Sequence, residues 1–176
     1  QHTVASEVSA TGVALHSGVR VQITLKSAPP DSGIIFRRTD LNPPQDIPAR
    51  ADLVKETRLA TTLVNGTAKV ATVEHLLAAC VGCGIDNAII ELDNLEVPIM
   101  DGSSAPFVYL IEQAGVVAQD AARRYIEVLE PVRVEMGDKF AELLPNSGDA
   151  QFEVDFTIDF SHPAIPDDQC RVRMKL

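Results

Sequence analysis

The sequence of 176 residues contains no tryptophan, and only 5% of its residues are aromatic. Aromatic side chains form the platforms on which nucleic-acid bases stack, so this scarcity disfavours a protein that binds single strands. Basic residues are also few: 15 lysines and arginines stand against 25 acidic residues, which gives a formal charge of −10. Because contacts with phosphates require positive charge, we predict that nucleic acid is not a partner.

Long apolar runs are absent as well, since no stretch approaches the roughly 18 apolar residues that a membrane helix needs. No charged segment followed by an apolar one marks a secretory leader. Only three cysteines occur, Cys80, Cys83 and Cys170. A small, odd number of cysteines is typical of proteins in a reducing compartment. We therefore predict a cytoplasmic protein with no membrane span.

What the chain does contain is an ordinary globular composition, with 45% hydrophobic and 23% charged residues. Its length allows one good hydrophobic core, or one domain and part of another. The sequence begins at Gln1 rather than Met, and Arg171–Leu176 alternates polar and apolar residues as a half-buried strand does. This strand has no obvious partner, so we expect a fragment of a longer protein; the alternative is a genuine C-terminal edge strand.

Apolar patterning predicts strands at both ends of the chain and two helices between them. The predicted strands cover residues 21–25, 33–36, 59–64, 68–71, 87–92, 125–134, 139–144 and 152–160. Asn65-Gly66 predicts a hairpin because both residues tolerate positive φ. The second helix is predicted to follow a cap at Ser103 or Ser104 and to end at Gly115. The pattern changes over residues 116–122, so we predict α+β layers with a domain boundary there.

The first predicted helix starts in the segment Thr72-Val73-Glu74-His75, with Thr72 as its N-cap. The apolar residues with helical spacing are Val73, Leu76, Leu77, Cys80 and Val81. At about 100° per residue, His75 falls almost opposite this stripe and Glu74 falls on its flank. The residues that share the face of His75 are small, and no charged residue follows Glu74 until Asp86. Another element can therefore pack close to this face.

Glu74 and His75 are thus the only strongly polar groups on a largely covered helix. A buried charge is costly unless it is paired or bound to a metal, so the pair is a candidate catalytic or metal site. The alternative is structural, because a single helical histidine is often a hydrogen-bonded core residue and a first-turn glutamate suits the helix dipole. One histidine cannot form a catalytic zinc site, which uses about three protein ligands.

Cys80 and Cys83 form a C-x-x-C pair, but the sequence has no second pair with which to bind zinc. A redox pair favours a helix N-terminus, which stabilises the thiolate, whereas this pair lies at the predicted C-terminal end. We therefore interpret both cysteines as small apolar packing residues.

Five strings of residues, taken together and in this order, point to a known family. They are Ala10–Gly18, Arg37–Leu41, Thr72–Leu76, Gly84–Asn87 and Val97–Ser103. These strings resemble the UDP-3-O-acyl-N-acetylglucosamine deacetylases, zinc amidases of bacterial lipid A synthesis. The resemblance implies two similar α+β domains with the active site between them. On that template, residues 1–122 form a sheet-and-helix layered first domain, and residues 123–176 form the opening strands of a second, similar domain.

The resemblance also implies roles for individual residues. Glu74 matches the general base, and His75 matches a ligand of the Zn²⁺ cofactor. The positions that match substrate contacts are Leu59, Ala60, Lys139, Asp159, Phe160 and His16. Leu59 and Ala60 match positions near the metal, and Lys139, Asp159 and Phe160 match positions at the uridine diphosphate end; His16 lines the same cleft. Asp101-Gly102-Ser103 is interpreted as a structural turn and cap.

The sequence departs from the family in length. The family's other zinc ligands lie on a His-x-x-x-Asp helix of the second domain, and its general-acid histidine lies further along; none of these matches a residue here. The remaining ligands and the acid are therefore expected from a missing C-terminal half.

The implied activity is zinc-dependent deacetylation of UDP-3-O-acyl-N-acetylglucosamine, with release of acetate, in the cytoplasm of a Gram-negative type of bacterium. The fragment alone is expected to be inactive. Two alternatives stay open: a short, non-catalytic relative with a binding or regulatory role, and a different zinc amidase or hydrolase that shares this first domain.

Overall fold

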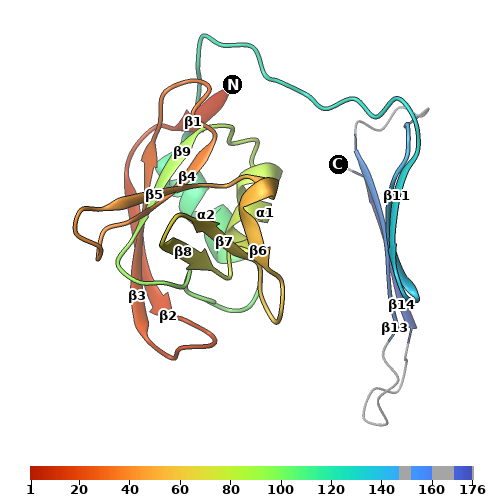
Figure 1. The fold of residues 1–176 in the computed structure, drawn as a ribbon. Coiled ribbons are helices and arrows are strands. Elements are labelled where there is room, and N and C mark those ends of the chain that lie inside the picture. The colour runs from red at the N-terminus through yellow and green to blue at the C-terminus, as the bar shows by residue number, and fades with distance from the viewer. Residues whose placement is uncertain (147–151, 160–168, 176) are drawn as a thin grey trace. The chain divides into compact units, whose positions relative to one another are not determined.

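The computed structural model describes residues 1–146, 152–159 and 169–175. The chain forms two compact units, Gln1–Arg123 and Arg124–Leu176, and each unit is described by itself (Figure 1). The first unit layers two helices against a mixed sheet, and the described part of the second contains strands and no helix. The α+β class predicted from the sequence is confirmed.

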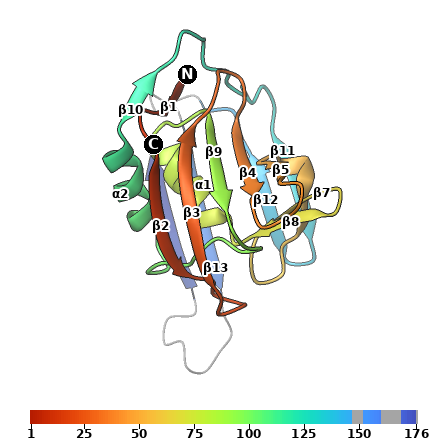
Figure 2. The same cartoon turned by 90° about the vertical axis from the view of Figure 1, so that its left-hand side faces the viewer.

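The main sheet of the first unit has five strands in the order β2-β3-β9-β4-β5 (Figure 2). These strands are β2 (Val8–Val13), β3 (Arg20–Ser27), β9 (Ala88–Leu92), β4 (Ile34–Arg38) and β5 (Gln45–Pro48). Strands β4 and β9 run parallel, and the other neighbours run antiparallel. In β3 the apolar residues Val21, Ile23 and Leu25 alternate with polar ones, and all three are buried. This period of two gives the sheet one apolar face.

Two smaller sheets border the main one. The first consists of β6 (Val54–Glu56), β7 (Thr62–Asn65) and β8 (Ala68–Ala71), after a 3₁₀ turn η1 (Ala51–Leu53). The second pairs β1 (His2–Val4) with β10 (Val116–Ala118). The predicted Asn65-Gly66 hairpin is confirmed, since Asn65 pairs with Ala68 and Gly66 has φ of 60°. The predicted strand over 59–64 is wrong at its start, because residues 57–61 form a loop before Thr62.

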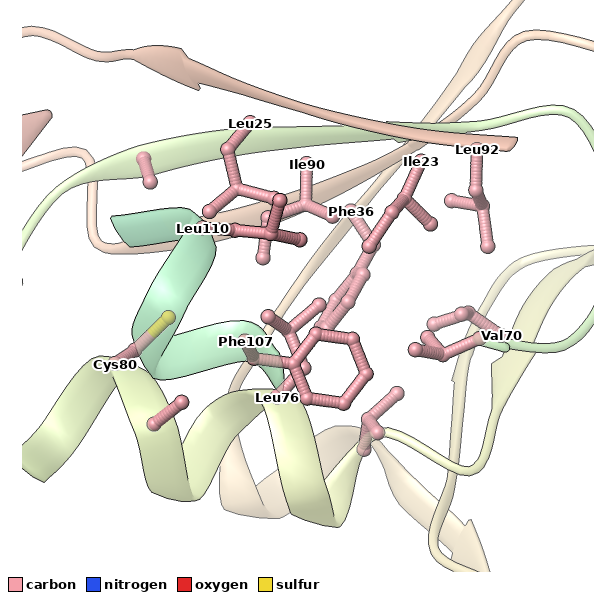
Figure 3. Close-up of a cluster of buried hydrophobic side chains, with 14 of the residues drawn as sticks. Ile23, Leu25, Phe36, Val70, Leu76, Cys80, Ile90, Leu92, Phe107 and Leu110 are labelled. Atoms are coloured by element: carbon pink, nitrogen blue, oxygen red, sulfur yellow. The ribbon is translucent and has the colours of Figure 1, made fainter. Parts of the chain in front are cut away.

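The helices are α1 (Glu74–Gly82) and α2 (Ala105–Ala114), which contact each other. Leu76 of α1 and Phe107 of α2 are fully buried and point toward the sheet residues Ile23, Phe36 and Ile90 (Figure 3). Burial of each such side chain contributes roughly 1.5–3 kcal/mol to folding. Among the described residues, neither helix is long and apolar enough to cross a bilayer.

Of two predictions about α1, one is wrong and the other is wrong at a single residue. Thr72 does not cap the helix: its φ is 59°, Val73 occupies the N-cap position, and no side-chain cap bond forms there. The predicted stripe is confirmed at Val73, Leu76 and Cys80, and Leu77 packs against the core, but Val81 is 69% exposed and Ala79 is buried instead. The sheet and α2 cover the side of α1 that carries Leu76, Ala79 and Cys80.

For α2, the observed start and end agree with those predicted from the sequence. The helix begins after Ser104, with a proline in its first turn, and Ser103 Oγ accepts the N–H of Ala105 at 3.1 Å. Gly115 follows the last helical residue with φ of 74°. A left-handed residue after a helix favours glycine, so this predicted end is confirmed.

The described part of the second unit forms two antiparallel hairpins. They pair β11 (Val132–Met136) with β12 (Lys139–Leu143), and β13 (Glu153–Asp159) with β14 (Gln169–Lys175). The predicted strand over 125–134 begins only at Val132. The predicted C-terminal strand is confirmed, but the expectation that it lacks a partner is wrong, because β13 pairs along its whole length.

Candidate active site

Helix α1 presents Glu74 and His75 as its first two residues, and both side chains are half-buried. Successive helical residues point about 100° apart, so the two side chains leave the helix in different directions. Glu74 suits this end of the helix, where unpaired N–H groups favour negative charge. The pair that the sequence singled out therefore stands at the edge of the first unit's core.

A loop lies directly against Glu74. The N–H of Thr61 donates a hydrogen bond to Glu74 Oε2, with 3.1 Å between N and O. This bond brings the loop of residues 57–61, with Leu59 and Ala60, to the start of α1. Leu59 has φ of 68°, and its side chain is 83% exposed. The loop thus offers an apolar side chain to solvent beside the carboxylate.

His75 lies near a second acidic group, Asp101. The hydroxyl and N–H of Ser103 both donate to Asp101 Oδ1, at 2.8 and 2.9 Å. These bonds lower the pKa of Asp101, and the charge of His75 makes a smaller contribution in the same direction. The Asp101-Gly102-Ser103 turn is structural, as predicted, and it also lies within electrostatic reach of the imidazole.

The structure adds one group that the sequence did not indicate, Glu96. Its side chain is 3% exposed. Oε1 accepts bonds from the N–H of His16 and the hydroxyl of Thr72, both at 3.0 Å. Oε2 accepts bonds from the N–H and the hydroxyl of Ser17, at 3.1 and 3.2 Å. Burial alone would raise the pKa of Glu96, but these four bonds lower it below its ordinary value.

Strained backbone gathers around Glu74 and His75. Among the described residues, four that are not glycine have positive φ: Asp31, Leu59, Thr72 and Met100. Leu59 lies in the loop bonded to Glu74, Thr72 precedes α1, and Met100 adjoins Asp101. Such conformations cost about 1–3 kcal/mol each and are found where surrounding contacts enforce them, often at functional sites.

The predicted substrate residues are distributed over both units. In the first unit, His16 is exposed in the loop between β2 and β3, and its backbone is held by Glu96. In the second unit, Lys139 begins β12 opposite Met136 and lines an open depression of about 310 Å³. Asp159 ends β13, where its backbone pairs with Gln169. Phe160 lies outside the described residues. The substrate contacts expected at these positions stay predictions.

The described residues do not complete a metal site. Nowhere in residues 1–146, 152–159 and 169–175 do three His, Cys, Asp or Glu side chains gather closely enough to hold an ion. The half-buried imidazole of His75 suits zinc as a single ligand, but about three protein ligands are usual for a catalytic ion. Further ligands would have to come from elsewhere.

The two cysteines of α1 behave as packing residues. Cys80 is 2% exposed and points into the core (Figure 3), and burial raises the pKa of its thiol to about 12. Cys83 packs at the edge of the same core, and burial also raises its pKa. A raised pKa disfavours the reactive thiolate, which supports the interpretation of both residues as apolar.

Comparison with known proteins gives one consistent result. The family model described as UDP-3-O-acyl N-acetylglycosamine deacetylase (LpxC) matches residues 1–176. Curated relatives with the name UDP-3-O-acyl-N-acetylglucosamine deacetylase include one from Idiomarina loihiensis, 58% identical over 168 residues, which are 95% of this chain and 54% of the relative. One from Pseudomonas entomophila is 57% identical, over 94% of this chain and 54% of the relative. The chain thus spans about half the length of the relatives it matches.

Proposed function

Because the chain belongs to the UDP-3-O-acyl N-acetylglycosamine deacetylase family, we propose that it supplies one half of an enzyme that hydrolyses the acetamide of UDP-3-O-acyl-N-acetylglucosamine. The relatives are named for this activity. The observation that carries the proposal is the placement of Glu74 and His75, half-buried, at the start of α1 beside a loop with an exposed apolar residue. A cytoplasmic location follows from a substrate linked to a nucleotide.

In this proposal Glu74 acts as the general base. Its Oε2 is occupied by the N–H of Thr61, which fixes the carboxylate and leaves Oε1 to take a proton from the attacking water. As the proton leaves, the water oxygen forms a bond to the acetyl carbon, and the carbon–nitrogen bond then breaks. The leaving amine takes up a proton from an acid that the described residues do not include. The products are acetate and the free amine.

His75 is the group that would hold zinc in this chain. When bound, zinc lowers the pKa of water toward about 7 and polarises a carbonyl oxygen. The imidazole must be neutral to offer a nitrogen lone pair to the metal. The carboxylate of Asp101 lies within electrostatic reach of the imidazole and supplies negative charge. The remaining ligands would come from the half that the relatives possess beyond this chain.

Substrate contacts are proposed at both ends of the molecule that is hydrolysed. Leu59 and Ala60 stand beside Glu74 and suit the glucosamine and the start of its acyl chain. Lys139, exposed at the start of β12, offers positive charge for the diphosphate. Asp159 and Phe160 are proposed to contact the uridine part of the substrate. His16 is proposed as a further lining residue.

The test is acetate release from UDP-3-O-acyl-N-acetylglucosamine by a full-length enzyme that carries this chain followed by the half found in the relatives. We expect Glu74→Gln to lower kcat by about 10²–10⁴-fold, because general bases contribute about this much. Zinc content, measured by elemental analysis, should stay unchanged. The matched control is Glu112→Gln on the exposed side of α2, which should keep full activity. Near wild-type turnover of Glu74→Gln would refute the proposed base.

A further inference from the structure

Glu96 is a buried carboxylate whose four hydrogen-bond partners are all neutral. An ionised carboxylate offers about four acceptor positions and no donor, so four converging donors satisfy it fully. A glutamine at this position would turn an NH₂ group toward at least one of these donors. Burial of a charge is costly even when hydrogen bonds satisfy it, so the network fixes a particular arrangement rather than simply filling the core.

One branch of the Glu96 network, the bond from the Thr72 hydroxyl, fixes the residues that lead into α1. Thr72 stands two residues before Glu74 and has φ of 59°, which is an outlier for a β-branched residue. Its hydroxyl is held by Glu96. The preceding residue, Ala71, is held by the same segment, since its N–H donates to Leu95 O and its carbonyl accepts the N–H of Val97, both at 3.0 Å. The turn from β8 into α1 is therefore fixed by residues 95–97.

The other branch holds the loop between β2 and β3. The N–H groups of His16 and Ser17 and the hydroxyl of Ser17 all donate to Glu96. Because one carboxylate bonds both branches, the backbone of His16 and the side chain of Thr72 lie within its reach, although 56 residues separate them in sequence (72 − 16). The carboxylate of Glu96 thus connects the loop between β2 and β3 to the start of α1 through hydrogen bonds.

We propose that Glu96 is a positioning residue that aims Glu74 and His75 through Thr72 and sets the substrate-facing loop at His16 through Ser17. This proposal rests on the proposed function, because the aim matters only if Glu74 and His75 carry the chemistry. Small misplacements of reacting groups can cost about 10²-fold in rate. Glu96 touches neither substrate nor metal in this scheme, so its effect passes through the residues it holds.

The kinetic test separates the two branches in the full-length enzyme. Thr72→Val keeps the β-branched shape and removes one bond; it should lower kcat with KM unchanged. Ser17→Ala loosens only the loop and should raise KM with kcat unchanged. Glu96→Gln disturbs both branches and should lower kcat about ten- to hundredfold and also raise KM. A loss of folded protein lowers the apparent kcat at unchanged KM, so it cannot produce the increases in KM expected for Ser17→Ala and Glu96→Gln. Unchanged kcat in both Thr72→Val and Glu96→Gln would overturn the proposal.

The matched control is Asp86→Asn. Asp86 is also a partly buried carboxylate, held by the N–H of His2 and by Arg123, but it lies beyond the C-terminal end of α1. It should lower the melting temperature and leave kcat and KM unchanged. Equal losses of kcat in Asp86→Asn and Glu96→Gln would show that both act only on stability, and would overturn the positioning role.

A measurement without turnover keeps the two proposals distinguishable. In the 176-residue chain, the ring and amide NMR signals of His75 should shift in Glu96→Gln and in Thr72→Val, and stay in place in Asp86→Asn. If the full-length enzyme releases no acetate while these shifts appear, the proposed function fails, and only the structural coupling of Glu96 to His75 stands. If acetate is released and the His75 signals are the same in all variants, the positioning fails and the function stands.

Discussion

At the residue scale, the adjacent side chains of Glu74 and His75 in the first turn of α1 have different neighbours. Glu74 is bonded to the N–H of Thr61, and His75 lies within electrostatic reach of Asp101. The angle of about 100° between successive helical residues makes this separation possible. A base and a metal ligand need such a division, because one must reach the water while the other holds the ion.

The role proposed for His75 predicts a loss of metal. In the full-length enzyme, His75→Ala should remove or strongly weaken zinc binding, since it deletes one of about three protein ligands. Elemental analysis after dialysis measures the effect. His2→Ala serves as the control, because His2 lies in β1 and should leave the zinc content unchanged. Full zinc occupancy in His75→Ala would contradict the assignment.

Asp86 predicts a pH-dependent stability. Burial raises its pKa, but the bonds from Arg123 and from the N–H of His2 outweigh this and lower it below the ordinary value of 3.8. A lowered pKa contributes stability that is present above pH 3.8 and is lost as the pH falls through the folded-state value. Asp86→Asn should therefore destabilise the chain by about 1–3 kcal/mol at neutral pH.

The check is urea unfolding, followed by circular dichroism, at pH 7 and at pH 3. The difference between wild type and Asp86→Asn should shrink at the lower pH. Asp52→Asn, at an exposed carboxylate paired with Arg50, should change stability little at either pH. A difference that is the same at both pH values would count against the ionised role of Asp86.

At the scale of elements, the segment 97–102 crosses β2 at a point where only glycine fits. A Cβ built on Gly12 would lie 2.8 Å from Pro98 Cβ and 2.9 Å from Met100 Sδ. The N–H of Ile99 also bonds to Val13 O at 3.0 Å. This close approach sets the path of the segment that ends at Asp101 beside His75.

We therefore expect Gly12→Ala to lower the free energy of unfolding by about 1–3 kcal/mol, as overpacking does. Gly82→Ala is the matched control, because nothing lies within 4 Å of a Cβ at Gly82. Alanine is the better helix former, so the control should be neutral or slightly stabilising. Urea unfolding of both variants measures the difference, and equal stabilities would show that the segment yields without cost.

At the scale of the whole molecule, the first unit is a domain in which helices and sheet form layers. In the second unit, the side chains of β11 and β12 are exposed on both faces of their hairpin. The part of the chain that the structure describes offers one proposed metal ligand and one proposed base, and no cluster of three metal-binding side chains. The described residues therefore carry only part of the proposed machinery.

This distribution predicts that the 176-residue chain alone releases no acetate and binds zinc weakly at best. An assay of the chain with substrate and added zinc tests the first point, and calorimetric titration with zinc tests the second. Addition of the half found in the relatives should restore both. Measurable turnover by the chain alone would show that these 176 residues suffice.

Several features followed from the sequence because they depend on local pattern. Alternation in β3, the Asn65-Gly66 hairpin and the glycine after α2 are set by neighbouring residues in the chain. The pair Glu74 and His75 stood out because no other strongly polar residue shares its helix. The family resemblance rested on strings of this local kind and is confirmed by the family match over residues 1–176.

Only the tertiary structure decided that Ala79 rather than Val81 belongs to the buried side of α1, because residue size does not reveal where the sheet and α2 lie. It also decided the conformation of Thr72. The sequence predicted an N-cap at this residue, but in the structure its hydroxyl donates a hydrogen bond to Glu96 instead. Glu96 itself resembled any surface glutamate in the sequence, since its partners His16 and Ser17 lie 80 and 79 residues away. Contacts over such separations form only when the chain has folded, and no local pattern records them.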